Sequence, residues 1–508
     1  MPSLSALPDG SPAQDIDIIP VTRSGTTYRV SAGAVRNKTV ATSLSAAGTT
    51  QANATALAAR INEVTTVTSG AGVRLPTAQA GMEVTVVNRG ANPLIVYGAA
   101  SGQGINDAGG IVQHQNVTVS SSTPVDLGGY GHTAAPWAPT REWAKNASVI
   151  DITDAPYSAS GNGSTDNQTA IQNAIDAAQS QGKPLYIPAG TFNHSGVLNV
   201  WSNVTVFGAG PASVLRATTP AASSVFLKEE NSALYNFRIT HANVTTRLHD
   251  GNTCGVFVET AATNFKIANM EIDNCASAGI LVFGAKGGYI LNNYVHDTKA
   301  DSIHNTRGAR RIHIAGNRTL NSGDDGIAVV SYGDDPGTTG DILAEFNTIL
   351  NNVGGRGMTV VGGDNVTYRK NYINNSGSYA GILVGGESSY NSFGATDITI
   401  EDNIITNCGS TGTGHPCLFL TNTSAYDCTG IKFIRNRVGP YPHAGIKVEG
   451  ALSKEALIAH NTIAGASNQV MVLAGVPAGT GGRHIIPPGG TATYYAVSGT
   501  RWYSRLSV

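Results

Sequence analysis

Three aspartates and one arginine are the residues whose types and spacing could do chemistry. Asp301, Asp325 and Arg356 each precede a small residue followed by an apolar one, and Asp324 adjoins Asp325. Carboxyl groups held close together raise one another's pKa, because their charges repel. Carboxyl groups with shifted pKa values suit acid–base catalysis, and we predict a catalytic site at these four residues. The alternative is that the acids hold a structural cation or only solvate a turn.

The spacing of these residues predicts that they stack in one column. A small residue followed by an apolar one recurs along the chain. The residue directly before each such pair should therefore fall on a common line that runs across the stacked repeats. Parallel strands lie about 4.8 Å apart, so neighbouring members of the line should lie about one strand spacing apart. The line contains Ala278, Asp301, Asp325, Arg356 and Ala380.

A second recurring residue shows what kind of element stacks. An asparagine flanked by alternating apolar residues returns about every 24 residues, with longer intervals where loops are inserted. Such a period predicts a solenoid of β-coils that bury their apolar faces against one another, with the asparagines in a hydrogen-bonded ladder. A β-sandwich, the alternative, would show no such register. The predicted ladder consists of Asn269, Asn293, Asn317, Asn347, Asn371, Asn403, Asn436 and Asn461.

The composition excludes several classes of protein. The 508 residues include 61 glycines and only 13% charged residues, and the net charge of −2 argues against a nucleic-acid binder. No apolar run is long enough to cross a bilayer, and Met1 is followed by no signal-peptide pattern. The five cysteines lack the spacing of a zinc site or disulfide framework. We expect many glycines to keep coil corners and the acidic column open for a ligand.

The segment after residue 142 begins the solenoid. Asp166 is placed to cap a helix that runs through Gln181, with an apolar face from Ile171 to Ala178 and Gly182 at its end. This helix and the following Pro188-Ala-Gly-Thr-Phe192 resemble the start of pectate-lyase-like right-handed β-helices, where the helix plugs the open end. The resemblance implies an all-β fold, a right-handed parallel β-helix over 142–465 with one capping helix and a C-terminal β cap over 466–508.

The acidic residues resemble the site of polygalacturonase-type glycoside hydrolases. Ala300-Asp301-Ser302 and Gly323-Asp324-Asp325-Gly326 match two of that family's segments. The resemblance implies that Asp324 protonates the leaving oxygen while Asp301 and Asp325 activate water, with inversion if the carboxyl groups are about 6.5–9.5 Å apart. The family's histidine is replaced by Arg356, and its arginine and lysine are missing from Gly381–Gly385. No cofactor is implied.

A lyase or epimerase acting on a uronic-acid polymer is the second possibility within enzymes. Arg356 beside three aspartates could serve such chemistry, with Ca²⁺ held by oxygen ligands; it could equally be only an ion-pair partner that tunes the acids. Loops beside the column supply candidate sugar-binding residues. These are His304, Arg307, Tyr332 and Glu387.

The N-terminal part suggests where the protein acts. We predict a β-hairpin within residues 1–40, a linker or short helix at 41–62 and a small β-sandwich-like domain at 63–138. Residues 10–35 resemble the N-terminal docking segments of phage tail proteins, and the layout resembles phage tailspikes, which are typically homotrimers. The resemblance implies a virion depolymerase that leaves the host by lysis, binds tail or baseplate proteins and cleaves a bacterial surface polysaccharide without inserting into membranes. The alternative is a virion spike that binds the glycan without cleaving it.

Overall fold

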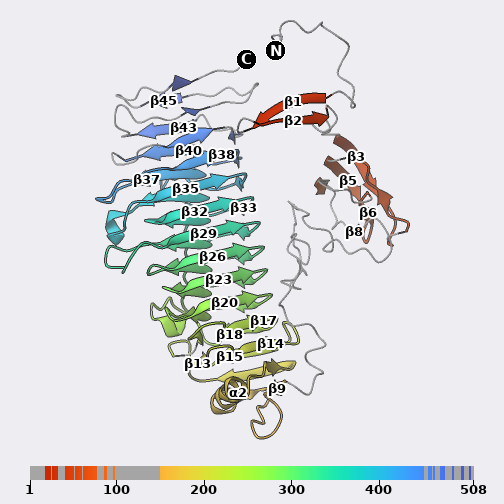
Figure 1. The fold of residues 1–508 in the computed structure, drawn as a ribbon, viewed down its shortest axis with the longest axis vertical. Coiled ribbons are helices and arrows are strands. Elements are labelled where there is room, and N and C mark those ends of the chain that lie inside the picture. Colours follow the sequence, from red (N-terminus) through yellow and green to blue (C-terminus); the bar gives the residue numbers. More distant parts are fainter. Residues whose placement is uncertain are drawn as a thin grey trace, which may run out of the picture. The chain divides into compact units, whose positions relative to one another are not determined.

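The computed structural model divides the chain into two compact units, Met1–Pro136 and Trp137–Val508. The structure describes residues 18–23, 26–31, 40–76 without 51 and 60, 85–88 and 95–97 in the first unit. In the second unit it describes residues 149–450 without 223, and then 456–459, 461–463, 469–474, 483–484, 494–496 and 503–504. Figure 1 shows the elements of both units.

The first unit contains one hairpin and two small parallel sheets. β1 (Ile18–Arg23) and β2 (Thr26–Ser31) pair antiparallel, which confirms the predicted hairpin. One sheet contains β3 (Val40–Ala46), β5 (Ile61–Val67) and β7 (Thr85–Asn88), and the other contains β4 (Thr55–Ala56), β6 (Gly72–Arg74) and β8 (Ile95–Tyr97).

The linker or short helix predicted for 41–62 is wrong, because β3 and β4 occupy much of that range. Ala46 alternates with exposed neighbours and packs with Leu57 and Val64, which favours a strand over a helix. All pairs within the two sheets are parallel, with consecutive strands assigned to different sheets; sandwiches are usually antiparallel. Residues 98–138 of the predicted sandwich-like domain lie outside the described residues.

The second unit is a solenoid of three parallel sheets with 12 strands each. Sheet 1 is the sheet that begins with β10 (Asn162–Asp166), sheet 2 the one that begins with β9 (Ile150–Asp151), and sheet 3 the one that begins with β13 (Leu198–Val200). Along the chain, each full coil adds one strand to sheet 3, then one to sheet 2 and one to sheet 1, as the stacked arrows of Figure 1 show. This is the predicted parallel β-helix. Sheet 1 consists of β10 (Asn162–Asp166), β12 (Gly190–His194), β15 (Ser213–Ala217), β18 (Arg238–His241), β21 (Glu271–Asp273), β24 (Tyr294–His296), β27 (Arg318–Leu320), β30 (Thr348–Leu350), β33 (Tyr372–Asn374), β36 (Ile404–Thr406), β39 (Arg437–Val438) and β42 (Thr462–Ile463).

The other two sheets have the same parallel pairing. Sheet 2 consists of β9 (Ile150–Asp151), β11 (Leu185–Ile187), β14 (Thr205–Gly208), β17 (Ala233–Tyr235), β20 (Thr263–Ala268), β23 (Lys286–Leu291), β26 (Arg310–Ala315), β29 (Gly340–Glu345), β32 (Asp364–Arg369), β35 (Thr396–Glu401), β38 (Lys432–Ile434) and β41 (Leu457–Ala459). Sheet 3 consists of β13 (Leu198–Val200), β16 (Val225–Leu227), β19 (Val256–Val258), β22 (Ile280–Phe283), β25 (Ile303–Thr306), β28 (Ile327–Val330), β31 (Met358–Val361), β34 (Ile382–Gly386), β37 (Leu418–Asn422), β40 (Ala444–Glu449), β43 (Gln469–Ala474) and β45 (Tyr494–Ala496).

The end of the solenoid lies further along the chain than the sequence suggested. β43 and β45 extend sheet 3 in register beyond residue 465, so the parallel pairing continues into the segment predicted as a separate cap. A short pair, β44 (Arg483–His484) and β46 (Tyr503–Ser504), is also parallel. No helix among the described residues is long and apolar enough to span a membrane.

The predicted helix at the start of the solenoid is present, but its N-cap lies one residue later than predicted. α2 (Gln168–Gln181) buries Ile171, Ala174, Ile175 and Ala178 and ends at Gly182, whose φ of 61° is the left-handed conformation that favours glycine. The N-cap is Asn167 rather than Asp166. The Asp166 carboxylate nevertheless accepts the backbone N–H of Gln168 at 3.1 Å, so it still serves the first turn.

A buried asparagine ladder runs along the solenoid at a coil corner. The Nδ2 group of each asparagine donates to Oδ1 of the next one at 2.9–3.0 Å and also to a backbone carbonyl. The ladder runs from Asn293 through Asn461 as predicted, but Asn269 is not part of it. Asn269 is an exposed turn residue with φ of 56°, and Met270 occupies the ladder position, where its backbone N–H donates to Oδ1 of Asn293.

The predicted column is confirmed by the register of sheet 3. Ile280, Ile303, Ile327, Met358 and Ile382 are direct partners in successive strands, so the residues two positions earlier stack as well. The backbone carbonyl of each column member accepts from the coil before it; Asp301, for example, accepts from Gly279 at 3.0 Å. The column therefore lies in the turns that lead from sheet 1 into sheet 3.

Candidate active site

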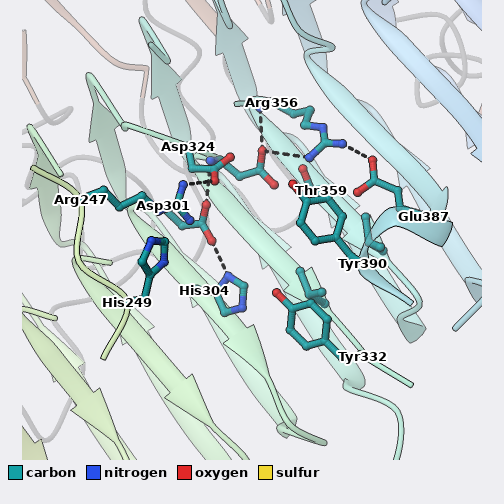
Figure 2. A pocket seen from close by; sticks show the side chains of 13 residues that line it. Arg247, His249, Asp301, His304, Asp324, Tyr332, Arg356, Thr359, Glu387 and Tyr390 are labelled. Carbon is teal, nitrogen blue, oxygen red and sulfur yellow. Dashed lines mark hydrogen bonds and ion pairs between the residues drawn. The ribbon is translucent and has the colours of Figure 1, made fainter. Parts of the chain in front are cut away.

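A pocket of about 390 Å³ lies on the outer face of sheet 3, over the acidic column. The turns between sheets 1 and 3 contribute the acids, strands β25, β28 and β31 form the floor, and loops after sheet 3 form one wall (Figure 2). The pocket is lined by Arg247, His249, Asp301, His304, Asp324, Asp325, Val330, Tyr332, Arg356, Thr359, Val361, Glu387 and Tyr390.

Stacked carboxylates are tolerated because the backbone of the next coil donates to them. Oδ1 of Asp301 accepts the N–H of Asp325 at 2.8 Å, and Oδ1 of Asp325 accepts the N–H of Arg356 at 2.6 Å. A buried carboxylate needs such donors, because an unpaired one would be expensive to desolvate. The two side chains are therefore held at fixed positions in the floor of the pocket.

Asp325 is the most deeply buried of the three acids. Burial raises its pKa to about 7; Asp301 and Asp324 add to the increase, while the charge of Arg356 opposes it. Asp325 is 5% exposed, and Nη1 of Arg356 lies 4.0 Å from its Oδ1. A carboxyl group that titrates near neutrality can exchange a proton at the pH at which most enzymes work.

Asp324 lies beside the column and is more open to solvent. Its Oδ2 accepts a 2.6 Å hydrogen bond from Nη1 of Arg247. Burial and the charge of Asp301 raise the pKa of Asp324, and the ion pair with Arg247 partly offsets the increase. Asp324 and Asp325, although adjacent in sequence, thus have different partners and different exposure.

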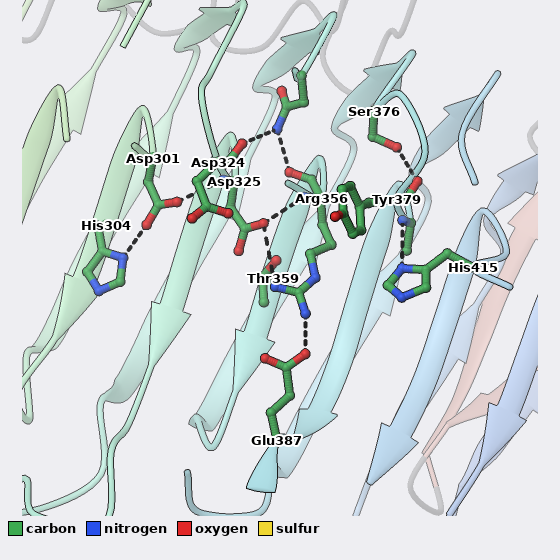
Figure 3. A network of polar contacts seen from close by, with 12 residues as sticks. Asp301, His304, Asp324, Asp325, Arg356, Thr359, Ser376, Tyr379, Glu387 and His415 are labelled. Atoms are coloured by element: carbon green, nitrogen blue, oxygen red, sulfur yellow. Dashed lines mark hydrogen bonds and ion pairs between the residues drawn. The ribbon is translucent and has the colours of Figure 1, made fainter. Parts of the chain in front are cut away.

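His304 is oriented by Asp301. It lies on β25, three residues after Asp301, and its Nδ1 contacts Oδ2 of that carboxylate (Figure 3). Burial lowers the pKa of His304, but the charge and hydrogen bond of Asp301, together with the charges of Asp325 and Asp324, outweigh burial and the pKa is raised overall. Hence the imidazole faces the pocket in a fixed orientation with its cationic form favoured.

Arg356 is held between two acids. Its Nη2 contacts Oε1 of Glu387, and the nearby Asp325 and Glu387 charges raise its pKa despite burial (Figure 3). On the next coil, Ala380 and Leu383 belong to an apolar cluster with Phe419. The pocket therefore has one buried guanidinium at this end, and it is already paired.

Two loops that are bonded to each other form a wall of the pocket. Tyr332 follows β28, and Tyr390 follows β34 within the 3-10 turn η4 (Ser388–Tyr390). The loops meet at a bridge between Tyr332 and Ser392 and at a 2.6 Å bond from Gly333 N–H to the carbonyl of Asn391. Tyr390 is 59% exposed, so an aromatic ring is available beside the acids for contact with a sugar.

The pocket contains seven of the eight site residues predicted from the sequence. The exception is Arg307, which lies over the ring of Phe283 at 5.5 Å and has its Nη1 3.6 Å from Asp335. Asp335 in turn accepts the N–H of Tyr332 at 2.9 Å.

Sequence reasoning missed four polar or aromatic lining residues, Arg247, His249, Thr359 and Tyr390. Arg247 and His249 come from the segment between β18 and β19, which lies outside the repeat pattern and 77 residues before Asp324. Thr359 could have been found, because sheet 3 register places it in line with Ala328 and His304.

Among the described residues, two separate groups of side chains each lie close enough together to hold a metal ion. Oxygen atoms of Asp301, Asp324 and Asp325 lie within 4.8 Å of one another. However, each of these carboxylates already contacts a basic side chain, namely His304, Arg247 or Arg356. The second group is Glu271, Asp273 and His296, where Arg238 binds Asp273 through two nitrogens at 2.7 and 2.8 Å.

Glycines beside the acids serve coil stacking. A Cβ atom at Gly355 would lie 2.5 Å from Oδ1 of Asp324, and one at Gly323 would lie 2.5 Å from the carbonyl oxygen of Lys299. Both distances are too short for a real contact. The expectation that these glycines clear space for a ligand is therefore corrected: they let neighbouring turns pack against each other.

Three long parallel sheets, each built from the strands of successive coils, define a parallel β-helix of the pectate-lyase-like class. The chain belongs to the rhamnogalacturonase A/epimerase, pectate lyase-like family, whose model matches residues 150–413. None of the curated proteins compared with the chain matches it.

Solved structures share the fold at low identity. The catalytic unit of the GH87 alpha-1,3-glucanase from Streptomyces thermodiastaticus strain HF3-3 superposes with a TM-score of 0.53 and 19% identity, over 73% of this chain and 70% of that chain. The AlgE6 A-module, a mannuronan C-5 epimerase of Azotobacter vinelandii, superposes with a TM-score of 0.52 and 17% identity, over 71% of this chain and 99% of that chain. The Dettilon tailspike protein superposes with a TM-score of 0.49 and 19% identity, over 64% of this chain and 68% of that chain.

Proposed function

We propose that the protein hydrolyses glycosidic bonds of a polysaccharide at the Asp301–Asp324–Asp325 site. The observation that carries the proposal is the division of three neighbouring carboxyl groups into different environments within one pocket. Asp325 is buried with a pKa of about 7, whereas Asp324 is partly exposed and ion-paired with Arg247. Neighbouring carboxyl groups with different pKa values are what glycoside hydrolysis requires.

In this proposal Asp324 is the general acid, because it is the most exposed of the three and faces the open pocket. It protonates the leaving oxygen as the glycosidic bond breaks. Asp301 and Asp325 hold and deprotonate the attacking water, and Arg356 stabilises the ionised form of Asp325. Direct attack of this water would invert the configuration at the anomeric carbon, and one carboxylate oxygen from each of the three acids lies within 4.8 Å of the others.

We further propose that the substrate is a bacterial surface polysaccharide and that the protein acts as part of a phage particle. Support comes from the N-terminal sequence, which resembles tail docking segments, followed by a β-helix of a carbohydrate-active family. Trimer formation belongs to the same proposal. Mass spectrometry of purified particles and light scattering of the purified protein test these two points.

A lyase or epimerase is the second candidate function, and one contact favours it. His304 is oriented by Asp301 and, in its neutral form, could abstract a proton from a sugar carbon; the family description also includes an epimerase. The residue expected to neutralise a uronate would be Arg247 or Arg356, and both are paired with acids.

The experiment is to incubate the protein with purified capsule, exopolysaccharide and O-antigen and to measure chain length, reducing ends and product mass. Hydrolysis shortens the chains, releases reducing ends and adds one water per cut. A lyase gives unsaturated ends without added water, and an epimerase leaves the chain length unchanged. Binding without any of these changes would support the non-catalytic spike.

A further inference from the structure

Arg247 reaches Asp324 from a segment that belongs to a much earlier coil. Residues 242–255 connect β18 to β19, whereas Asp324 follows β27, three strands further along sheet 1. The segment is tied down at Leu248, whose N–H donates to the carbonyl of Ala276 at 2.7 Å. The guanidinium of Arg247 then extends over the acidic column to Asp324.

Both oxygens of Asp324 have close neighbours in this arrangement. Oδ1 packs against the backbone of Gly355, so closely that no Cβ would fit there. Oδ2 accepts the 2.6 Å hydrogen bond from Nη1 of Arg247. A leaving oxygen that is to receive a proton from Asp324 must come within hydrogen-bond distance of one of these atoms. The oxygen on the open side is the one that Arg247 covers.

Charge gives a second reason why the contact cannot persist during the reaction. An arginine at hydrogen-bond distance favours the ionised form of a carboxyl group, whereas a general acid must carry a proton. The side chains of Arg247 and Asp324 are 42% and 28% exposed, so this pair is accessible to an entering sugar. The other charged or titratable groups that face Asp324 are Asp301, Asp325, His304, Tyr332 and Arg356.

We propose that Arg247 is a positioning residue that favours the ionised form of Asp324 in the free protein and is displaced when a sugar enters the pocket. On displacement Asp324 takes a proton from bulk water. That proton passes to the leaving oxygen as the glycosidic C–O bond breaks, and the carboxylate then pairs again with Arg247. This inference rests on the proposed function, because it assumes that Asp324 is the general acid.

The first test needs no substrate. Carbon-13 NMR of aspartate-labelled protein, with Asp324 assigned by comparison with Asp324→Asn, measures the pKa of Asp324 in the wild type and in Arg247→Met. We expect the pKa to rise by about one unit or more in Arg247→Met, since an adjacent opposite charge is worth about 1–3 units. Arg247→Lys should restore much of the wild-type value, and Arg307→Met, outside the pocket, should not change it. An unchanged pKa in Arg247→Met overturns the inference.

The second test follows the pH dependence of hydrolysis of a cleaved polysaccharide. The alkaline limb of kcat/KM reports the free enzyme and should move to higher pH in Arg247→Met, whereas the alkaline limb of kcat reports the complex and should stay in place. If both limbs move together, Arg247 stays paired in the complex and displacement is wrong. If the wild type releases no reducing ends while the NMR shift is present, the proposed function fails and the Arg247–Asp324 contact stands.

Discussion

The backbone N–H of Asp325 donates a 2.8 Å hydrogen bond to Oδ1 of Asp301, which lies one coil earlier. The contact links two acids whose charges would otherwise repel each other without compensation. It also ties the geometry of the pocket to the stacking of the coils, because the donor belongs to the backbone. The acids are thus part of the solenoid, which explains how they can be both buried and close together.

Replacing Asp301 should separate its structural role from its chemical one. Asp301→Asn keeps an oxygen that accepts the Asp325 N–H, whereas Asp301→Ala leaves that donor unsatisfied at a cost of about 1–3 kcal/mol. Both variants should lose hydrolysis by about 10²–10⁴-fold, since a group in acid–base catalysis contributes that much. Urea unfolding and reducing-end assays measure the two effects. Asp334→Asn, at a side chain 82% exposed, is the matched control and should change neither.

The pKa of Asp325 predicts a pH-dependent stability. The value of about 7 in the folded protein lies above that of an unfolded aspartate, so the folded state holds an extra proton between roughly pH 4 and 7. The stabilisation is therefore present at pH 4 and is lost as the pH rises through 7. Relative to Asp325→Asn, the wild type should lose a few kcal/mol of unfolding free energy across this window, because a tenfold difference in proton affinity between the folded and unfolded states is worth about 1.4 kcal/mol. Parallel stability curves for the two proteins would refute the assignment.

Arg356 should set the acid limb of the pH–rate profile. Its positive charge lowers the pKa of Asp325, which must be ionised to activate water. In Arg356→Met the acid limb of kcat/KM should move up by about one unit, so that activity at pH 6 falls about tenfold and recovers at higher pH. A loss of activity that is equal at every pH would contradict this role. Arg307→Met serves as the control.

The asparagine ladder should be a major source of solenoid stability. Asn371→Ala removes bonds to Asn347 and Asn403, which are both buried, and should cost about 2–4 kcal/mol because partners on both sides lose a hydrogen bond. Asn269→Gly should cost less than about 1 kcal/mol, since glycine accepts the positive φ and Asn269 lies outside the ladder. Equal losses in chemical denaturation would mean that the ladder contributes little.

The sequence predicts the repeating part of the site well because the repeat itself carries the information. Asp301, Asp325 and Arg356 stand at equivalent positions before sheet 3 strands, so the register of one coil predicts the next. The same logic predicts the ladder, and it fails at Asn269 because a one-residue offset moves a side chain from the buried corner into an exposed turn.

Residues from insertions could not be predicted in this way. Arg247 and Tyr390 belong to loops of irregular length, and only the folded chain shows that they reach the column. Arg307 gives the opposite case: it lies near the site in sequence, but its guanidinium contacts Asp335 and the Phe283 ring instead of the pocket. Proximity along the chain is thus a weaker guide than register.

The origin of the oxygen at the new chain end tests the central claim most directly. Purified surface polysaccharide is digested in water enriched in the heavy oxygen isotope, with wild type and with Asp324→Asn, and the products are weighed by mass spectrometry. We predict that wild-type products carry one heavy oxygen at each new reducing end and that Asp324→Asn gives almost none. Shortened wild-type products without the added water, or digestion that proceeds equally in Asp324→Asn, would contradict hydrolysis by this site.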